Sequence, residues 1–136
     1  MKVFINYSSK DEALATKIVE SLEDAGLDAW YKKREILPGD NWAEKVANGL
    51  KESNAMVVLV TPDAMESDAV RGSLSYALAE PAFSKRLIPV IVEDSEDLLT
   101  DKMPWILKRL RTVKLSKDGK NEEQFKEIAQ ALKDAA

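Results

Sequence analysis

The stretch Met56-Val57-Val58-Leu59-Val60-Thr61 is almost entirely apolar and is followed at once by Pro62. An apolar run without polar alternation predicts a strand buried on both faces, as in the middle of a parallel sheet covered by helices. Thr61 is a favourable helix N-cap, and Pro62 suits the first helical position, so a helix should follow directly. We therefore take this stretch as the central strand and expect a functional surface at its carboxyl end.

Strand and helix signals alternate on both sides of this stretch. Short apolar segments predict further strands at residues 2–6, 27–31, 87–92 and 112–115, with amphipathic helices between them. Five strands alternating with helices indicate an α/β fold with a parallel sheet, right-handed crossovers and helices on both faces. The natural sheet has five strands in the flavodoxin-like order 2-1-3-4-5, and residues 1–136 are expected to form a single domain.

Local signals predict where several helices begin. Ser9 has capping-box spacing with the glutamate three residues later, and Asn41 and Asn121 precede two later helices. The segment from Pro62 to residue 80 predicts one helix, or two helices broken near Ser67. Trp105 is expected to anchor the last crossover to the core. The acidic residues 93–101 are expected to form a solvated loop.

Composition excludes several classes of function. The 136 residues are 45% hydrophobic and 32% charged, which is typical of a soluble globular protein. The net charge of −4 gives no overall attraction to nucleic acid or to an anionic membrane. The chain has neither cysteine nor histidine, so any catalysis must rely on carboxylates, hydroxyls, lysine or arginine. No apolar stretch reaches about 18 residues, and a strand begins at once, so we expect a cytoplasmic protein without a membrane span or signal peptide.

Other domains with this topology need motifs that are missing. A phosphate-accepting receiver domain needs acidic residues after the first strand and an aspartate closing the third, where this chain has Asn6-Tyr7-Ser8 and Val60-Thr61. The two serines after the first strand are too few for a flavin phosphate loop, and no glycine-rich nucleotide motif occurs. A flavodoxin-like nucleotide binder therefore remains only as a secondary alternative.

Four blocks of sequence resemble Toll/interleukin-1 receptor (TIR) domains of the bacterial type. They appear in the family's order and cover nearly the whole chain, so the resemblance is specific. The blocks are Val3-Phe4-Ile5-Asn6-Tyr7-Ser8-Ser9-Lys10-Asp11, similar to "FISYSSKD"; Ala29-Trp30-Tyr31 with Leu37-Pro38-Gly39-Asp40-Asn41-Trp42; Val57 to Thr61, similar to "VVLVS"; and Arg86-Leu87-Ile88-Pro89-Val90, similar to "RxIPV".

The resemblance implies a reaction on NAD+. Many TIR domains cleave the bond between nicotinamide and ribose, forming ADP-ribose or cyclic variants, whereas others only assemble with further TIR domains. Bacterial members serve in anti-phage defence or as effectors. In the enzymatic members a glutamate in the helix after the third strand contacts the ribose. Its carboxylate can stabilise the oxocarbenium-like centre that the departing base leaves.

This chain departs from the family pattern at that glutamate. Where members read "S-x-W-V-R-x-E-I-x-Y-A-L", residues 67–78 place Ala69 at the tryptophan and Ser73 at the glutamate. Serine carries no charge, so the loss should reduce the rate by roughly 10²–10⁴ or more. The chain could be a naturally inactive member, an engineered variant, or one in which another acid substitutes. Glu80 is a poor substitute, because it lies about 10 Å further along the helix.

The resemblance places an NAD+ site at the strand edge formed by residues 4–11, 30–42 and 69–76. A mononucleotide-sized cleft is expected there beside Tyr7 and Ser73, with NAD+ as substrate and neither cofactor nor metal. The expected contacts with NAD+ come from Tyr7, Ser8, Asp11, Trp30, Tyr31, Arg34, Asn41, Trp42, Ala69 and Tyr76. Simpler roles stay open: Ser8 and Asp11 could merely cap the first helix, Trp30 could be core, and residues 32–34 could be a solvated basic loop.

Two hypotheses of function follow. The first is a TIR domain of the NAD+-cleaving type that Ser73 leaves weak or inactive. The second is a non-catalytic TIR module that signals by self-association with other TIR domains. Its assembly loop would be Ile36, Leu37, Pro38, Gly39 and Asp40, which the family uses to reach a neighbouring domain.

Overall fold

The computed structural model describes residues 1–92, 104–116 and 121–135, and its centre is a parallel sheet of five strands. The strand order is β2-β1-β3-β4-β5, which confirms the predicted topology. The strands are β1 (Lys2–Asn6), β2 (Asp28–Trp30), β3 (Ala55–Val60), β4 (Leu87–Val92) and β5 (Val113–Leu115). Register places Asn6 beside Val58 and Val58 beside Pro89. The carboxyl ends of β1 and β3 therefore meet at one edge.

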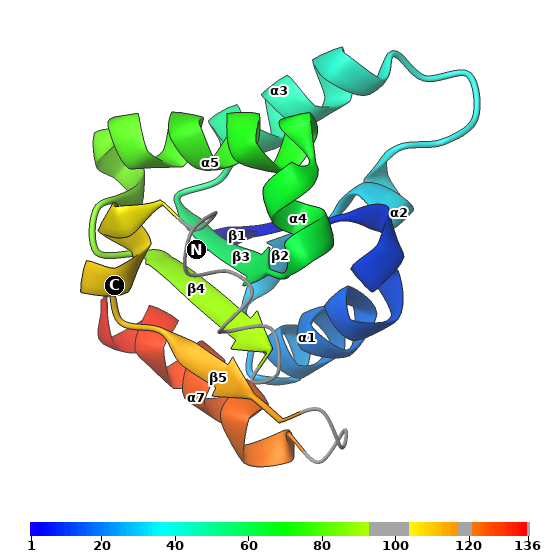
Figure 1. The fold of residues 1–136 in the computed structure, drawn as a ribbon. Coiled ribbons are helices and arrows are strands. Elements are labelled where there is room, and N and C mark those ends of the chain that lie inside the picture. The colour runs from blue at the N-terminus through cyan, green and yellow to red at the C-terminus, as the bar shows by residue number, and fades with distance from the viewer. Residues whose placement is uncertain (93–103, 117–120, 136) are drawn as a thin grey trace.

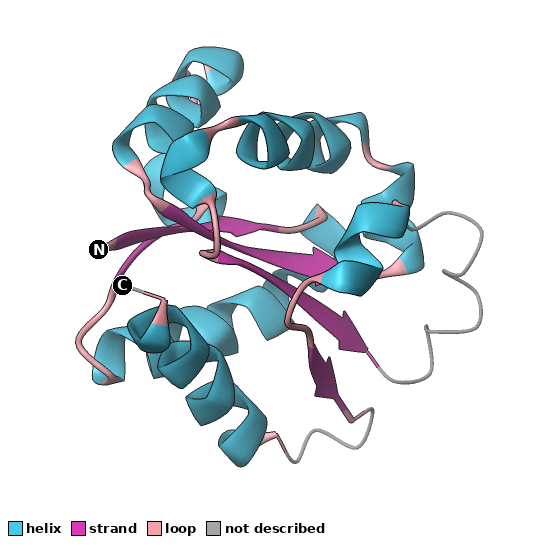
Figure 2. Cartoon of the chain, turned by 90° about the vertical axis from the view of Figure 1, so that its left-hand side faces the viewer, coloured by secondary structure: helices cyan, strands magenta, loops and turns pink. Residues whose placement is uncertain are grey.

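Helices cover both faces of the sheet. One face carries α3 (Trp42–Glu52), α4 (Pro62–Glu66) and α5 (Asp68–Ala79), and the other carries α1 (Glu12–Asp24) and α7 (Glu122–Asp134), as Figures 1 and 2 show. Short helical segments join them: η1 (Ser9–Asp11), α2 (Lys32–Glu35), η2 (Pro81–Phe83) and η4 (Trp105–Arg109). Within the described ranges, no helix is both long enough and apolar enough to cross a membrane.

Strand β3 separates two apolar cores. All six of its residues are buried, as its apolar run predicted. Val57 and Leu59 pack on the α1 and α7 side, and alternate residues of β3 pack on the α5 side. Burying a Val or Leu side chain contributes about 1.5–3 kcal/mol relative to exposing it. Both helical layers are thus needed to keep this strand from water.

Side-chain caps fix the helices at the carboxyl edge. Thr61 Oγ1 accepts from the Ala64 amide at 3.1 Å and donates to Asp11 Oδ2 at 2.7 Å, which ties η1 to α4. Ser67 caps α5 and separates it from α4, so the expected break near Ser67 is confirmed. Asn41 caps α3 through the Glu44 amide.

Several local expectations were wrong. Ser8, not Ser9, provides the side-chain cap, and it caps η1 rather than α1. Asn121 does not cap α7; its amide pairs with both backbone groups of Ser116 at 2.8 and 3.0 Å. Trp105 is 70% exposed and anchors no core. The supposed loop after β2 contains a helical turn, α2. The acidic segment 93–101 lies outside the described residues.

Helix α3 is held mainly by its carboxyl-terminal half. Gly49 and Leu50 are buried. In the first two turns, residues 42–48, Val46 is partly buried and the other six residues are exposed. The buried face rests on Trp30, whose ring stacks on Phe4 with centroids 4.7 Å apart. A Cβ on Gly49 would lie 2.5 Å from the Trp30 ring. Trp30 therefore fills the space between the sheet and the α3 backbone.

We expect Gly49→Ala to destabilise the protein by about 1–3 kcal/mol, because neither the indole nor the helix backbone can yield without repacking. Gly72→Ala is the matched control. Gly72 is also inside a helix, but nothing lies within 4 Å of its added Cβ. That substitution should stabilise by about 0.5–1 kcal/mol through helix propensity. Urea unfolding midpoints measure both, and equal midpoints for the two variants would contradict this packing role.

Candidate functional site

A small cavity lies at the carboxyl edge of the sheet, where Tyr7 and Ser73 are among the residues that line it. Its volume is about 20 Å³, enough for one water molecule but far below the ~300–1,000 Å³ of ligand pockets. The described residues that line it are Phe4, Ile5, Asn6, Tyr7, Trp30, Lys32, Trp42, Val46, Ala69, Val70 and Ser73. The expected mononucleotide-sized cleft is therefore closed in this structure, because large side chains from β2, α2 and α3 fill it.

Ser73 lies in the cavity wall on the buried face of α5, one turn after Ala69. It is 7% exposed, so its environment is largely desolvated. None of the described lining residues carries a carboxylate. Glu80 lines a different hollow at the other end of α5, which agrees with its rejection as a substitute. Ser73, which the resemblance aligned with the family glutamate, thus brings no charge to this wall.

Asn6 is a buried polar residue that the sequence reasoning did not assign to the site. Its side-chain amide donates to the Val70 carbonyl at 2.9 Å and approaches Met56 Sδ at 3.8 Å. This bond joins the end of β1 to the first turn of α5. The position of Asn6, a polar residue at the end of an apolar strand, was the sequence signal that could have pointed to this role. Asn6 therefore helps to position the helix that carries Ser73.

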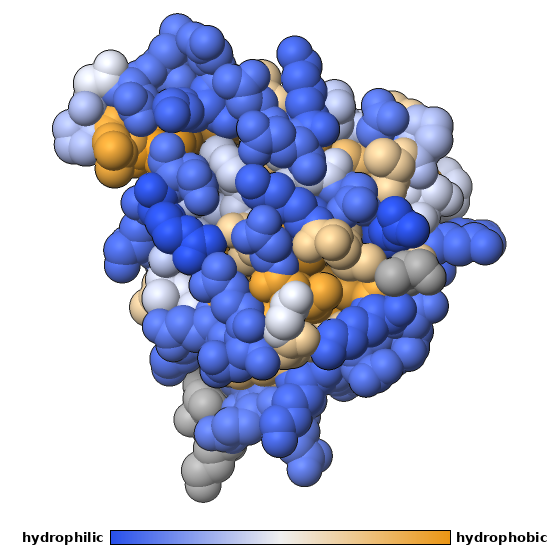
Figure 3. All heavy atoms as spheres, turned by 180° about the vertical axis from the view of Figure 1, so that it is seen from behind, coloured by the Kyte–Doolittle hydropathy of each residue, from blue (hydrophilic) through white to orange (hydrophobic). Residues whose placement is uncertain are grey.

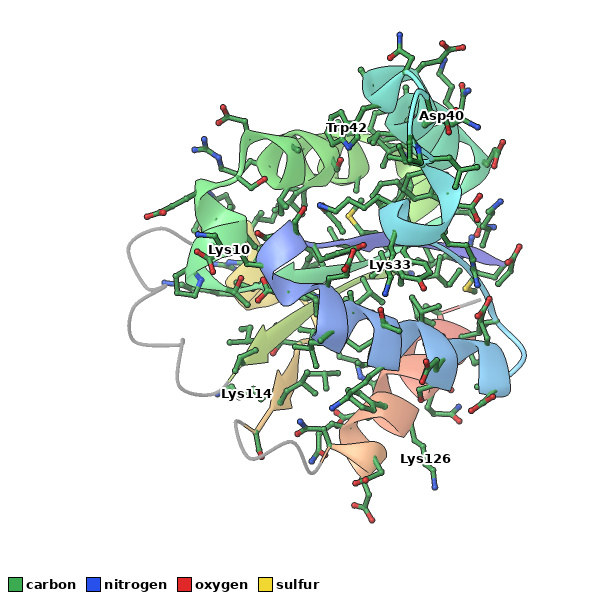
Figure 4. The ribbon with its side chains drawn as sticks, turned by 90° about the vertical axis from the view of Figure 1, so that its right-hand side faces the viewer. Lys10, Lys33, Asp40, Trp42, Lys114 and Lys126 are labelled. Atoms are coloured by element: carbon green, nitrogen blue, oxygen red, sulfur yellow. The ribbon has the colours of Figure 1, made fainter. Side chains whose placement is uncertain are left out.

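Lys32 supplies the only charge among the described lining residues. Its Nζ donates to the Tyr7 carbonyl at 3.1 Å and lies 4.6 Å from the Tyr7 ring centroid. Burial lowers the pKa of Lys32 and raises the pKa of Tyr7 to about 12. Tyr7 Oη accepts from the Lys33 amide at 3.3 Å, while the Lys33 side chain is exposed (Figure 4). The basic run is thus divided: Lys32 belongs to the cavity, and Lys33 does not.

Only some predicted contact residues gather at the cavity. Tyr7, Trp30, Trp42, Ala69 and Ser73 line it. Trp42 is 45% exposed and stands at the start of α3 beside α5 (Figure 4).

The other predicted residues make structural contacts nearby or elsewhere. Ser8 caps η1, Asp11 accepts from Thr61, and Asn41 caps α3. Tyr31 packs in the core on the α1 side. Arg34 donates to the Ala29 carbonyl at 2.6 Å and to Glu23 at 3.0 Å, and that second bond raises its pKa. Tyr76 packs edge-on against Phe83, at a centroid distance of 6.1 Å. A role for any of these side chains in binding NAD+ stays a prediction.

A larger hollow of about 740 Å³ lies between the end of α5, η4 and the end of α7. Its apolar wall includes Phe83, Leu87 and Ile106. Among the described residues that line it, three are cationic and two are carboxylates: Lys85, Arg109 and Arg111, with Glu80 and Asp134. Arg111 and Asp134 pair at 3.7 Å. No pattern in the sequence had indicated this groove. Among the described residues, no group of three or more carboxylates could hold a metal ion.

Comparisons with known proteins agree with this architecture. A family model described as the TIR domain matches residues 3–131. The 2' cyclic ADP-D-ribose synthase AbTIR of Acinetobacter baumannii is 27% identical over 90 residues, covering 65% of this chain and 34% of that protein. The 2' cyclic ADP-D-ribose synthase BtTIR of Bacteroides thetaiotaomicron is 24% identical over 86 residues, covering 62% of this chain and 30% of that protein. The chain therefore spans about a third of the length of these curated relatives.

Solved structures support the fold. The TIR domain of the Toll-related receptor TRR-2 from Hydra magnipapillata matches with a TM-score of 0.70 at 22% identity, covering 98% of this chain and 96% of that chain. The fold is thus that of a solved TIR domain. Because the family model covers nearly the whole described fold, the chain belongs to the TIR domain family.

Proposed function

We propose that this chain is a TIR domain of the NAD+-cleaving type whose own site is weak or inactive, and that it acts by associating with other TIR domains. One observation carries the catalytic half of this proposal. The described wall around Ser73 holds one ammonium group, from Lys32, and no carboxylate. The curated relatives named as cyclic ADP-ribose synthases support NAD+ chemistry at the level of the family. We propose in addition that the protein acts in bacterial defence or signalling, in the cytoplasm.

The charge at the site explains the expected loss of activity. Release of nicotinamide leaves positive charge on the ribose, and a preorganised carboxylate stabilises it in the water-poor site. The Ser73 hydroxyl offers a dipole only. The Lys32 ammonium beside it raises the energy of a developing cation. The closed cavity adds a second barrier, since Trp42 or Lys32 must move before a nucleotide can enter.

The loop between α2 and α3 supports the association half of the proposal. Leu37 is 61% exposed and Trp42 is 45% exposed, and apolar atoms are visible where this loop projects (Figure 3). The loop nevertheless has a defined turn conformation. The Leu37 amide donates to Asp40 Oδ2 at 2.9 Å, and Gly39 has φ +92°. An exposed apolar side chain on an ordered turn is a suitable anchor for a neighbouring domain.

The groove of about 740 Å³ is complementary to that loop. The Leu37 side chain is exposed and apolar, and the groove has an apolar wall that includes Phe83, Leu87 and Ile106. A contact between the loop of one copy and the groove of the next joins two different surfaces. Such heterologous contacts build rings or open chains rather than two-fold dimers. This favours head-to-tail association.

Restoring the carboxylate tests the catalytic half. We expect Ser73→Glu to release nicotinamide from NAD+ faster than the natural protein, by at least about tenfold, because single catalytic groups contribute about 10²–10⁴. Ser73→Gln has the same size without the charge and should show no gain, so it controls for steric effects in the small cavity. Nicotinamide release is followed by chromatography, with circular dichroism to verify folding. Equal rates for the two variants would remove support for an NAD+-cleaving ancestry of the site.

Charge and shape changes on the two surfaces test the association half. Leu37→Asp and Arg109→Glu should each abolish the concentration-dependent rise in mass measured by sedimentation. Mixing the two variants should restore a heterodimer, because one copy keeps an intact loop and the other an intact groove. Lys51→Glu, an exposed site on α3 with the same charge change as Arg109→Glu, should associate normally. A mixture that stays monomeric would contradict the loop-to-groove contact.

A further inference from the structure

We propose that the cavity beside Ser73 selects nucleotides that lack the pyridinium charge, taking ADP-ribose in preference to NAD+, and that Lys32 sets this selectivity. The inference rests on the proposed function, because it assumes that the nucleotide enters at this edge of the sheet. It goes beyond weak catalysis, since it makes the domain a receptor for a product of NAD+ cleavage.

The charges around the cavity point to this selectivity. Lys32 is the only charged side chain among the described lining residues, and no ion pair in the described part of the chain includes it. Glu12 acts on Lys32 through space but does not pair with it. Asp11 is engaged by the Thr61 hydroxyl, and Asp63 by Lys10 at 3.5 Å. The cavity therefore presents a positive charge that no ion pair in the described part of the chain neutralises.

The Lys32 ammonium is held in place rather than free to turn away. Its bond to the Tyr7 carbonyl and its position over the Tyr7 ring fix it from two directions. Tyr7 itself is 3% exposed and is anchored by the Lys33 amide. Swinging the ammonium into solvent would give up both contacts. A ligand that enters the cavity must therefore meet this charge.

The chemistry of the two ligands differs at the atoms that would meet Lys32. The nicotinamide of NAD+ is a cationic pyridinium, and like charges a few ångström apart in a partly buried site repel strongly. ADP-ribose carries a hydroxyl at the same carbon, which can accept a hydrogen bond from an ammonium group. The diphosphate is common to both ligands, so the difference lies at this carbon alone. Ser73 adds a neutral hydroxyl in place of the carboxylate that would have attracted the pyridinium.

Entry requires the cavity to enlarge, and Trp42 is the wall that can move with the least disruption. Its ring is 45% exposed, and the neighbouring turns of α3 are largely exposed as well. Trp30 on the opposite wall is 4% exposed and stacked on Phe4, so it stays in the core. Displacing Trp42 leaves both apolar cores intact. Ligand binding should therefore change the fluorescence of Trp42.

Isothermal titration calorimetry with three ligands tests the selectivity. NADH is the matched probe for NAD+, because its dihydronicotinamide has nearly the same size and no charge. We expect ADP-ribose and NADH to bind at least about tenfold more tightly than NAD+, in line with repulsion between unit charges near a protein surface. In Lys32→Met the difference should shrink to within a factor of about three. Lys33→Met, at an exposed neighbouring position outside the cavity wall, should keep the full difference.

A fluorescence titration adds a second measurement at the site itself. It uses Trp105→Phe protein, which removes an exposed tryptophan outside the cavity wall and leaves Trp30 and Trp42. ADP-ribose should change the emission at the concentrations that calorimetry gives.

Three results would overturn the inference: NAD+ binding as tightly as NADH, an unchanged difference in Lys32→Met, or no binding of any of the ligands. The proposed function is judged separately. Nicotinamide release by Ser73→Glu and sedimentation of the loop and groove variants do not depend on which ligand the natural protein prefers. Selective binding lost in Lys33→Met as in Lys32→Met would also count against the inference, because it would place the effect outside the cavity.

Discussion

The burial of β3 on both faces is the constraint on which the rest of the fold depends. Its six residues have no exposed surface, so the chain must supply helices on each side of the sheet. Parallel strands joined by helical crossovers then bring every carboxyl end to one edge. That edge brings Tyr7 from the end of β1 and Ser73 from α5 to one cavity, although they are distant in sequence. The topology of the sheet therefore determines where the cavity lies, whichever side chains line it.

Features with a periodic or local cause could be predicted from the sequence. The sheet order, the Thr61 and Asn41 caps and the break at Ser67 follow from such signals, whereas Ser73 was assigned to this edge by the family resemblance alone. Features that depend on how distant side chains fill space could not. The cavity is closed because Trp30, Lys32 and Trp42 meet there from β2, α2 and α3, and no pattern in the sequence encodes those contacts. For the same reason the sequence did not distinguish Lys32 from the rest of the basic run at residues 32–34, which could have been a solvated loop.

The same packing explains why only part of the apolar face of α3 is buried. Its apolar residues have helical spacing, yet Ala43 and Ala47 are exposed because only the end with Gly49 reaches Trp30. The amino-terminal turns and the loop before them consequently project from the body (Figure 1). Exposed apolar surface on an ordered projection is more consistent with a contact surface than with a strained packing error. Weak docking of one helix thus links the closed cavity to the exposed loop.

The change at residue 73 affects more than one catalytic group. With a glutamate there, Lys32 would face an opposite charge across the cavity, and the pair would be close to neutral. With serine, Lys32 remains as the only charge on the described wall, so the local potential becomes positive. A positive potential disfavours the pyridinium end of NAD+ as well as a cationic transition state. The loop at Leu37 and the groove near Arg109 share no lining residue with this cavity. In the function proposed here, association persists while the cavity changes from cleaving NAD+ to holding a nucleotide that lacks the pyridinium charge.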